Sequence, residues 1–271
     1  MRIRLVPASA YPLDVLTAAY NRARSDYLVP MPMTPETLST YNTRHSVDLS
    51  ASWVAETEGE LIAIGLLGVR GARAWLTRIG VVREVRQYGV GRALVEALLD
   101  SARASGVTSV QLEVISENAI AQRLFKSMAF SPVRRLLVLD RPAGFPSVPG
   151  PIPDRTLSSG EAAALAENGD RGYAPSWVEE PPSVRRARRL TGLALGDSAV
   201  LTGDDGTQLS PVVLCAADGM TGPGLLTALH QQRPERPARK ENIPEDDVQV
   251  GWFLTAGYEV AFTRVEMARS L

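Results

Sequence analysis

The stretch from Ile79 to Arg92, IGVVREVRQYGVGR, constrains the fold of this 271-residue chain more than any other part of the sequence. Apolar residues within 75–82 predict a strand before it, and apolar positions that recur at i, i+1, i+4, i+5 and i+8 from Leu94 predict an amphipathic helix after it. Between them, Gly89 and Gly91 leave the first backbone amides of that helix accessible. Because unpaired amides at a helix N-terminus attract anions, the turn predicts an anion site.

Three kinds of glycine turn could stand at this position. A Walker loop needs a lysine and a hydroxyl residue after the second glycine, whereas this chain has Arg92 and Ala93. A dinucleotide fingerprint needs a third glycine, which the chain does not supply. The third possibility is a strand-helix connection that needs only flexible residues.

The residues on either side of the turn add a resemblance to a known family. R-x-x-G-x-G from Arg86 to Gly91, after an apolar strand, resembles the acyl-CoA-binding motif of the GNAT superfamily of N-acetyltransferases. Residues 109–115 alternate as a half-buried strand, and the segment after it is similar to the family pattern N-x-x-A-x-x-L-[FY]-x-x-x-G-F. The resemblance covers residues 79–130. The chain departs from the pattern at Ala129, where the family usually has Gly, and at Phe125, where many members have Tyr.

The resemblance implies an α/β fold in which helices flank a mixed, mostly antiparallel central sheet. It also implies an acetyl-CoA site, with main-chain groups of the strand holding the pantetheine arm, the turn holding the diphosphate, and Asn118 contacting the cofactor from the next helix start. The expected cofactor-binding residues are Ile79, Val81, Arg86, Gln87, Tyr88, Gly89, Val90, Gly91, Arg92, Asn118 and Phe125.

The implied reaction is transfer of an acyl group, with acetyl expected, to a primary amine by direct attack on the thioester. The attacking amine must lose a proton, and Glu113 is the candidate base because it alternates with the buried positions of the strand beside the cofactor. A solvated or ion-paired strand carboxylate is the competing interpretation of Glu113. Phe125 cannot protonate the leaving thiolate, as a Tyr there is proposed to do in many relatives. A non-catalytic acyl-CoA-binding sensor or interaction module is therefore the alternative function.

The second half of the chain resembles a degenerate copy of the first. A shift of 128 residues lays 111–130 over 239–258 without a gap, and Gly257-Tyr258 restores the Gly-aromatic ending of the family pattern. The turn at 217–224 has no arginine, carries Asp218 and includes Pro223, which removes a donor amide. The expected organisation is a GNAT domain with the acyl-CoA site at 1–141, a linker at 142–154 and a degenerate GNAT-like domain at 155–271.

Composition excludes several other classes of protein. A net charge of −1 without a long basic block gives no support to a nucleic-acid groove. The single cysteine allows no intrachain disulfide, and with two separated histidines no metal site is expected. No apolar run is long enough to span a membrane, and the first residues contain no apolar signal core, so a cytoplasmic location is expected. The expected partner is a small-molecule or peptide amine, whose pocket in the family is built from variable loops such as 24–50.

A fused second copy also predicts the oligomeric state. Many single-domain relatives form dimers, and a degenerate copy in the same chain can bury the equivalent surface as a pseudo-dimer. We therefore expect a monomer of 29.2 kDa in light scattering. A stable species of about twice that mass, independent of dilution, would contradict this expectation.

Overall fold

The computed structural model describes residues 3–187 and 189–271, which divide into two compact units. Unit 1 comprises Met1–Val133 together with Val265–Leu271, and unit 2 comprises Arg134–Arg264. This division differs from the boundaries expected from the sequence. Apolar residues at 133–139 predict a strand that would close the first domain, yet this strand lies in unit 2 from Arg134 onward, and the last residues of the chain return to unit 1. Alternation of apolar residues identifies a strand but not the sheet that it joins.

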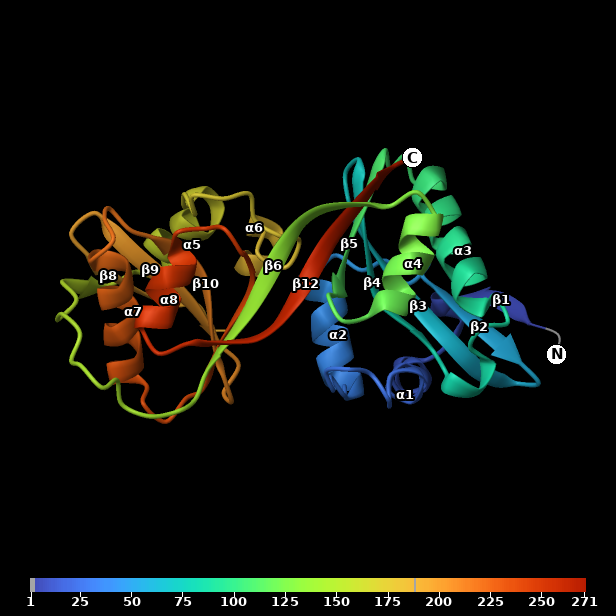
Figure 1. Ribbon diagram of the computed structural model, residues 1–271, viewed down its shortest axis with the longest axis horizontal. Coiled ribbons are helices and arrows are strands. Elements are labelled where there is room, and N and C mark those ends of the chain that lie inside the picture. The colour runs from blue at the N-terminus through green and yellow to red at the C-terminus, as the bar shows by residue number, and fades with distance from the viewer. Residues whose placement is uncertain (1–2, 188) are drawn as a thin grey trace. The chain divides into compact units, whose positions relative to one another are not determined.

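The sequence pattern predicts a strand, two helices, three strands, the glycine turn with its helix, a strand and a helix. Unit 1 contains these elements in that order, together with two 3₁₀ turns and the end of a strand from the far end of the chain, which were not predicted (Figure 1). They are β1 (Arg4–Pro7), the 3₁₀ turn η1 (Ala8–Ala10), α1 (Leu13–Ala23), α2 (Pro35–Arg44), β2 (Trp53–Thr57), β3 (Glu60–Arg70), β4 (Arg73–Val81), the 3₁₀ turn η2 (Arg83–Val85), α3 (Val90–Ala104), β5 (Ser109–Ile115), α4 (Ala119–Ser127) and the end of β12 (Glu259–Ser270). Thr34-Pro35-Glu36 predicts a helix start with Thr34 as the cap, and the structure has this cap, because the Thr34 side chain accepts a hydrogen bond from the Thr37 amide.

The sheet of unit 1 has the strand order β1-β2-β3-β4-β5, with β12 next to β5. The first four strands pair antiparallel and β4 pairs parallel to β5, so the predicted mixed sheet is confirmed. Two glycines show which face each helix covers. A side chain at Gly65 would meet α3, and a side chain at Gly80 would meet the end of α1. Because Gly80 pairs with Ile64, the neighbour of Gly65, these two helices lie on opposite faces of the sheet.

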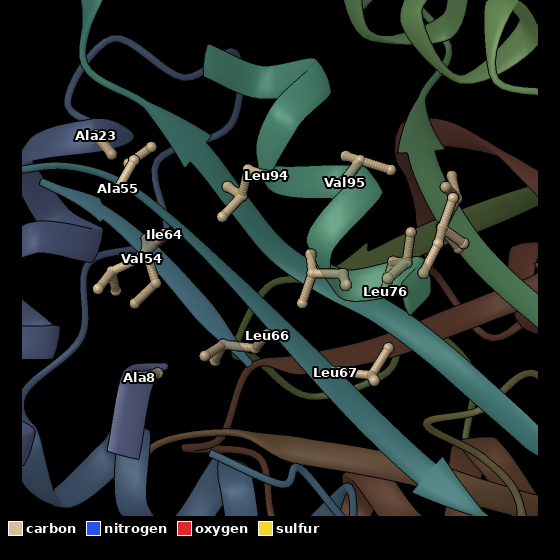
Figure 2. Close-up of a cluster of buried hydrophobic side chains, with 14 of the residues drawn as sticks. Ala8, Ala23, Val54, Ala55, Ile64, Leu66, Leu67, Leu76, Leu94 and Val95 are labelled. Carbon is tan, nitrogen blue, oxygen red and sulfur yellow. The ribbon is translucent and has the colours of Figure 1, made fainter. Parts of the chain in front are cut away.

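The apolar core of unit 1 lies between the sheet and these helices (Figure 2). The predicted stripe of α3 is buried at all five expected positions, from Leu94 to Ala102. Met267 of β12 is fully buried in the same core, and Val265 and Leu271 pack against it. The first unit therefore needs residues from the far end of the chain to complete its hydrophobic core.

Unit 2 has a similar succession of strands and helices. Its elements are β6 (Ser131–Arg141), β7 (Arg155–Thr156), α5 (Ser159–Asn168), α6 (Pro181–Arg185), β8 (Thr191–Leu195), β9 (Ser198–Asp204), β10 (Leu209–Cys215), α7 (Thr221–Gln232), β11 (Ala238–Pro244), α8 (Gln249–Thr255) and the start of β12. Its strand order is β6-β11-β10-β9-β8-β7, in which β10 and β11 pair parallel and the other neighbours pair antiparallel. Among the described residues, no helix is both long and apolar enough to cross a lipid bilayer.

The ends of α4 and α8 repeat one another in detail. Phe130 N–H donates to the carbonyl of Phe125 and Tyr258 N–H donates to that of Phe253, each over 3.1 Å. The two aromatic pairs pack edge to face, with ring centroids 5.8 and 5.0 Å apart. The residue before each second ring is left-handed, Gly257 at φ 86° in unit 2 and the non-glycine Ala129 at φ 62° in unit 1. The shared helix ending supports the internal repeat and explains why the family pattern has glycine there.

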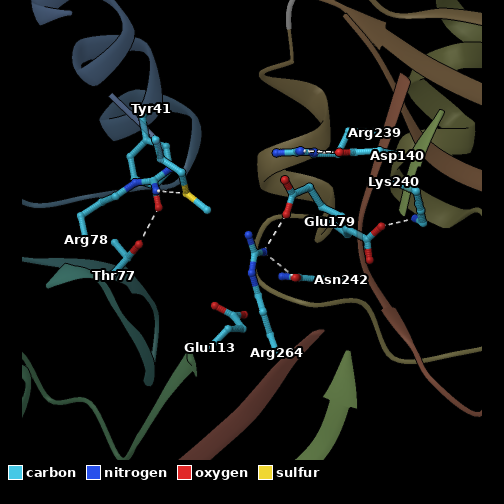
Figure 3. A network of polar contacts seen from close by, with 12 residues as sticks. Tyr41, Thr77, Arg78, Glu113, Asp140, Glu179, Arg239, Lys240, Asn242 and Arg264 are labelled. Atoms are coloured by element: carbon cyan, nitrogen blue, oxygen red, sulfur yellow. Dashed lines mark hydrogen bonds and ion pairs between the residues drawn. The ribbon is translucent and has the colours of Figure 1, made fainter. Parts of the chain in front are cut away.

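A charged pair is buried in unit 2 (Figure 3). Lys240 of β11 is 2% exposed and forms an ion pair with Glu179, which is 3% exposed. The Tyr173 hydroxyl donates to the other carboxylate oxygen of Glu179 over 3.5 Å. Removing one partner would leave a buried charge without compensation, so replacing either residue alone should destabilise this unit.

The left-handed Ala129 gives a stability prediction. Ala129→Gly should raise the free energy of unfolding by about 0.5–1 kcal/mol, because the left-handed strain of an L-residue exceeds the entropy that glycine adds to the unfolded chain. Gly257→Ala should lower it by a similar amount. Denaturant unfolding measures both changes. Ala163→Gly, at an exposed helical position of α5, is the control and should destabilise. A destabilised Ala129→Gly protein would show that the strain is absent.

Candidate active site

The strands β4 and β5 separate part of the way along their length. Their parallel pairing ends at Leu76 and Leu112, yet β4 continues to Val81 and β5 continues to Ile115. A bulge accompanies the separation, because the β3–β4 register shifts beside Arg78, which has a φ of 53°. The two strands therefore leave a slot whose edges carry backbone groups without a strand partner.

The open edge of β4 presents the Val81 amide to this slot. Val82 N–H donates to the Ile62 carbonyl of β3 over 2.9 Å. Hydrogen-bonded and non-hydrogen-bonded pairs alternate along an antiparallel ladder, so the backbone groups of Val81 point away from β3. The geometry fits the expectation that this amide faces a ligand.

Two arginine side chains donate hydrogen bonds to backbone carbonyl groups on the same edge of β4. Arg24 Nη1 donates to the Ile79 carbonyl over 3.1 Å, and Arg86 Nε donates to the Val81 carbonyl over 2.9 Å. The expected main-chain ligands Ile79 and Val81 thus lie on the slot, but their carbonyl oxygens are already bonded within the protein. Arg86 therefore takes up one of the two acceptor positions of the Val81 carbonyl and lies where a ligand would approach it.

The glycine turn lies where β4 leads into α3. Gln87 and Gly89 are both left-handed, with φ values of 71° and 80°, and the first helical bond runs from Ala93 N–H to the Gly89 carbonyl. Within residues 3–187 and 189–271, no group accepts a hydrogen bond from the amides of residues 87–92. A row of free amides at the positive end of a helix is suited to a phosphate group. The predicted residues Tyr88, Val90 and Gly91 lie in this row.

The arginine side chains that flank the turn have partners of their own. Both guanidinium Nη atoms of Arg86 bond the Asp26 carboxylate, over 2.7 and 2.6 Å, and these hydrogen bonds hold the pKa of Asp26 below its ordinary value. Arg92 donates to the Ser127 hydroxyl over 2.6 Å and lies 3.7 Å from Glu96. The sequence motif located both arginines but gave no sign of these partners.

The expected α4 residues lie beside the turn with structural contacts. The Asn118 side chain caps α4 by accepting from the Ala121 amide over 3.1 Å. Phe125 is 6% exposed and belongs to the core. A Cβ at Gly91 would lie 3.5 Å from the Leu124 side chain, so the start of α3 and α4 are in close contact. This distance is ordinary van der Waals contact, so the packing of α4 does not by itself require glycine at position 91.

Glu113 lies on β5 directly after the pairing with β4 ends. Its Oε2 accepts a hydrogen bond of 2.6 Å from the Trp75 indole of β4. Because Glu113 is on the face opposite Leu112 and Val114, it is not part of the apolar core. Glu113 thus lies where the two strands separate, and the Trp75 indole holds one oxygen of its carboxylate.

An aromatic and cationic group next to β4 was not predicted (Figure 3). The Tyr41 hydroxyl bonds Thr77 Oγ1 over 2.5 Å, and the Arg78 guanidinium lies 4.2 Å from the Tyr41 ring centre. Burial raises the pKa of Tyr41 and lowers the pKa of the adjacent His45 well below its ordinary value. No spacing rule brings α2 residues to a strand bulge, so pattern analysis could not find this group.

The corresponding turn of unit 2 is filled by its own side chains. The Asp218 carboxylate accepts from the amides of Met220 and Thr221, over 2.9 and 2.8 Å, and the Thr221 amide bond is the largest cause of its lowered pKa. The Trp252 ring packs so closely on Gly222 that a Cβ there would approach it to 2.6 Å. An aspartate and a tryptophan thus take the space that the turn of unit 1 leaves open.

Comparisons with known proteins agree with the fold. The profile described as Acetyltransferase (GNAT) family matches residues 16–130. The chain is 34% identical over 104 residues to mycothiol acetyltransferase of Beutenbergia cavernae, covering 37% of this chain and 35% of that protein. It is 36% identical over 73 residues to the [ribosomal protein bS18]-alanine N-acetyltransferase of Escherichia coli K12, covering 27% and 49%. The chain thus spans about a third to a half of the length of these relatives.

Solved structures match over nearly the whole chain. A GCN5-related N-acetyltransferase from Sphaerobacter thermophilus has a TM-score of 0.75 at 15% identity, covering 99% of this chain and 95% of that one. A tandem GNAT protein from the clavulanic acid biosynthesis pathway has a TM-score of 0.70 at 16% identity, covering 99% and 98%. Residues 16–130 therefore form a domain of the GNAT acetyltransferase family, and the chain as a whole has the fold of a tandem GNAT protein.

Proposed function

We propose that this protein is an acyl-CoA-dependent N-acyltransferase that moves an acetyl group from acetyl-CoA to a primary amine in unit 1. The observation that supports this proposal most is that β4, which forms one edge of the slot, leads directly into the turn whose backbone amides are free. The slot suits the extended pantetheine arm, and the turn suits the diphosphate. Acetyl-CoA supplies the activated acyl group as a thioester.

Different residues at the slot and the turn bind the diphosphate, stabilise the oxyanion and remove the proton of the amine. The amides of residues 87–92 hold the diphosphate, and the positive end of α3 adds to its binding. The Val81 amide stabilises the oxyanion that forms when the amine attacks. Glu113 takes the proton of the amine, directly or through water, with Trp75 fixing one carboxylate oxygen.

The acceptor is assigned only as a primary amine. The two curated relatives have different names, mycothiol acetyltransferase and [ribosomal protein bS18]-alanine N-acetyltransferase, so neither name identifies the acceptor of this chain. Small-molecule and peptide amines both remain in the proposal. A panel of such amines, followed by release of free thiol from acetyl-CoA, identifies the class.

Phe125 supports a second candidate, an acyl-CoA-binding module without turnover. It is buried against Phe130 and offers no proton to a leaving thiolate. In the enzyme, solvent supplies that proton. Thiol release with any amine at a rate above buffer excludes the binding module.

The anion turn predicts one acetyl-CoA site per chain. Gly89→Asp should weaken acetyl-CoA binding at least about tenfold more than Gly89→Asn, because both side chains tolerate a left-handed residue but only Asp repels a diphosphate. Calorimetry measures both affinities and the number of sites. Gly219→Asp, in the filled turn of unit 2, is the matched control and should change neither. Two equivalent sites, or equal losses for the Asp and Asn variants, would contradict the assignment.

Phe125 yields a prediction about proton supply. Phe125→Tyr adds one hydroxyl to a packed ring, so the variant should fold and bind acetyl-CoA as before. It should also turn over at least as fast with the true acceptor if the hydroxyl reaches the sulfur, since general-acid help is typically worth roughly 10²–10⁴-fold. Steady-state kinetics of thiol release provide the measurement. Equal binding without any gain would show that thiolate protonation does not limit the rate.

Glu113 yields a prediction about the base. Glu113→Gln should lower kcat by about 10²-fold or more while acetyl-CoA affinity stays unchanged, because the amide cannot accept the proton. Glu117→Gln, which changes an exposed carboxylate on the same segment, is the control. An unaltered rate would leave Glu113 as a strand carboxylate without a catalytic role.

A further inference from the structure

The Arg86 side chain lies across the edge of the cofactor slot and is held there by three hydrogen bonds. Its Nε donates to the Val81 carbonyl over 2.9 Å, and its two Nη atoms bond both oxygens of Asp26 over 2.7 and 2.6 Å. The guanidinium therefore uses a donor from each of its three nitrogens on the protein itself. Arg86 is also the first residue of the turn that holds the proposed diphosphate.

Asp26 belongs to the segment between α1 and α2, and that segment is anchored on both sides of it. Before Asp26, Arg24 bonds the Ile79 carbonyl and stacks on Tyr27, with 3.5 Å from guanidinium carbon to ring centre. After it, the Asn21 side chain of α1 donates to the Met33 carbonyl and accepts from the Met33 amide, over 2.8 and 2.9 Å. Between these anchors, Asp26 makes its contact with Arg86.

We propose that Asp26 is a latch residue that holds Arg86 over the slot until the cofactor's diphosphate takes the guanidinium from it. The proposal rests on the proposed function. When Arg86 moves to the diphosphate, it frees the Val81 carbonyl to accept a hydrogen bond from an amide of the pantetheine arm. The same movement frees the segment around Asp26, so cofactor binding is coupled to the connection between α1 and α2.

The chemistry of the two anions favours this exchange. Carboxylate and phosphate both accept the paired donors of a guanidinium, and a diphosphate carries the larger negative charge. The side chains of Arg86 and Asp26 are 41% and 34% exposed, and such an ion pair contributes little to stability. The latch is thus strong enough to set the resting position of Arg86 and weak enough to open.

The test is calorimetric titration of CoA into the full-length protein and its variants. Asp26→Asn should tighten CoA binding by about three- to tenfold, because the ligand no longer competes with a carboxylate for Arg86. A residue with a merely structural role would weaken binding when replaced. Asp100→Asn, which breaks a comparable exposed pair with Arg103 on α3, is the control and should leave the affinity unchanged.

The Arg86→Met background separates the latch from a simple charge effect. If the latch is correct, Asp26→Asn should no longer change CoA affinity once the guanidinium is absent. If Asp26 instead repels CoA directly, Asp26→Asn should raise CoA affinity more in this background than in the wild-type protein. In the wild-type protein, amide hydrogen exchange of residues 25–30 should rise when CoA binds.

Weaker or unchanged CoA binding by Asp26→Asn overturns the latch, as does a gain in affinity that persists in the Arg86→Met background. Slower exchange of residues 25–30 on CoA binding overturns it too. If the wild-type protein does not bind CoA, both the proposed function and the latch are wrong. If the wild-type protein binds CoA but the variants or the exchange data give one of the results above, only the latch is wrong.

Discussion

The loss of pairing between β4 and β5 is the constraint on which the proposed site depends. Parallel strands that stayed paired would satisfy each other's amides and carbonyls, and no ligand could enter between them. The bulge beside Arg78 and the end of the pairing at Leu76 leave these groups available. Arginine side chains cover the exposed carbonyls of Ile79 and Val81, so the edge is satisfied in part by groups that can move.

The two units show how the same frame can keep or lose such a site. In unit 2 the parallel pairing of β10 and β11 is reduced to Leu209 with Ala238, and β10 also has a register shift. Its turn nevertheless offers no anion site, because Asp218 bonds the amides and Trp252 covers Gly222. The shared fold of the two units depends on the periodic pattern of apolar residues, whereas the anion site depends on the few side chains at the turn.

The sequence predicted most of the fold of unit 1 because its helices and strands follow strong periodic patterns with clear ends. The stripe of α3 and the Thr34 cap of α2 are examples. The assignment of β6 and β12 to the two units could not be predicted, since apolar alternation identifies a strand but not the sheet that it joins. Tertiary structure, not local pattern, decides that choice.

The candidate site could be predicted where a motif fixes backbone geometry and not where side chains meet across the fold. The turn at 87–92 and Glu113 were found from spacing, and both lie at the slot. Asp26, Trp75 and Arg78 were missed, because their roles come from contacts over 38 to 60 residues of sequence separation. The partners of Arg86 and Arg92 within unit 1 were missed for the same reason.

The central claim is that the free amides of unit 1 form the binding site of an acyl-CoA, and backbone amide NMR tests it directly. On titration with acetyl-CoA, the amide signals of residues 87–92 and of Val81 should shift most, because hydrogen bonds to phosphate and thioester oxygens replace bonds to water. The amides of residues 218–224 in unit 2 should not respond. Large shifts at 218–224, or none at 87–92 under saturating acetyl-CoA, would contradict the account.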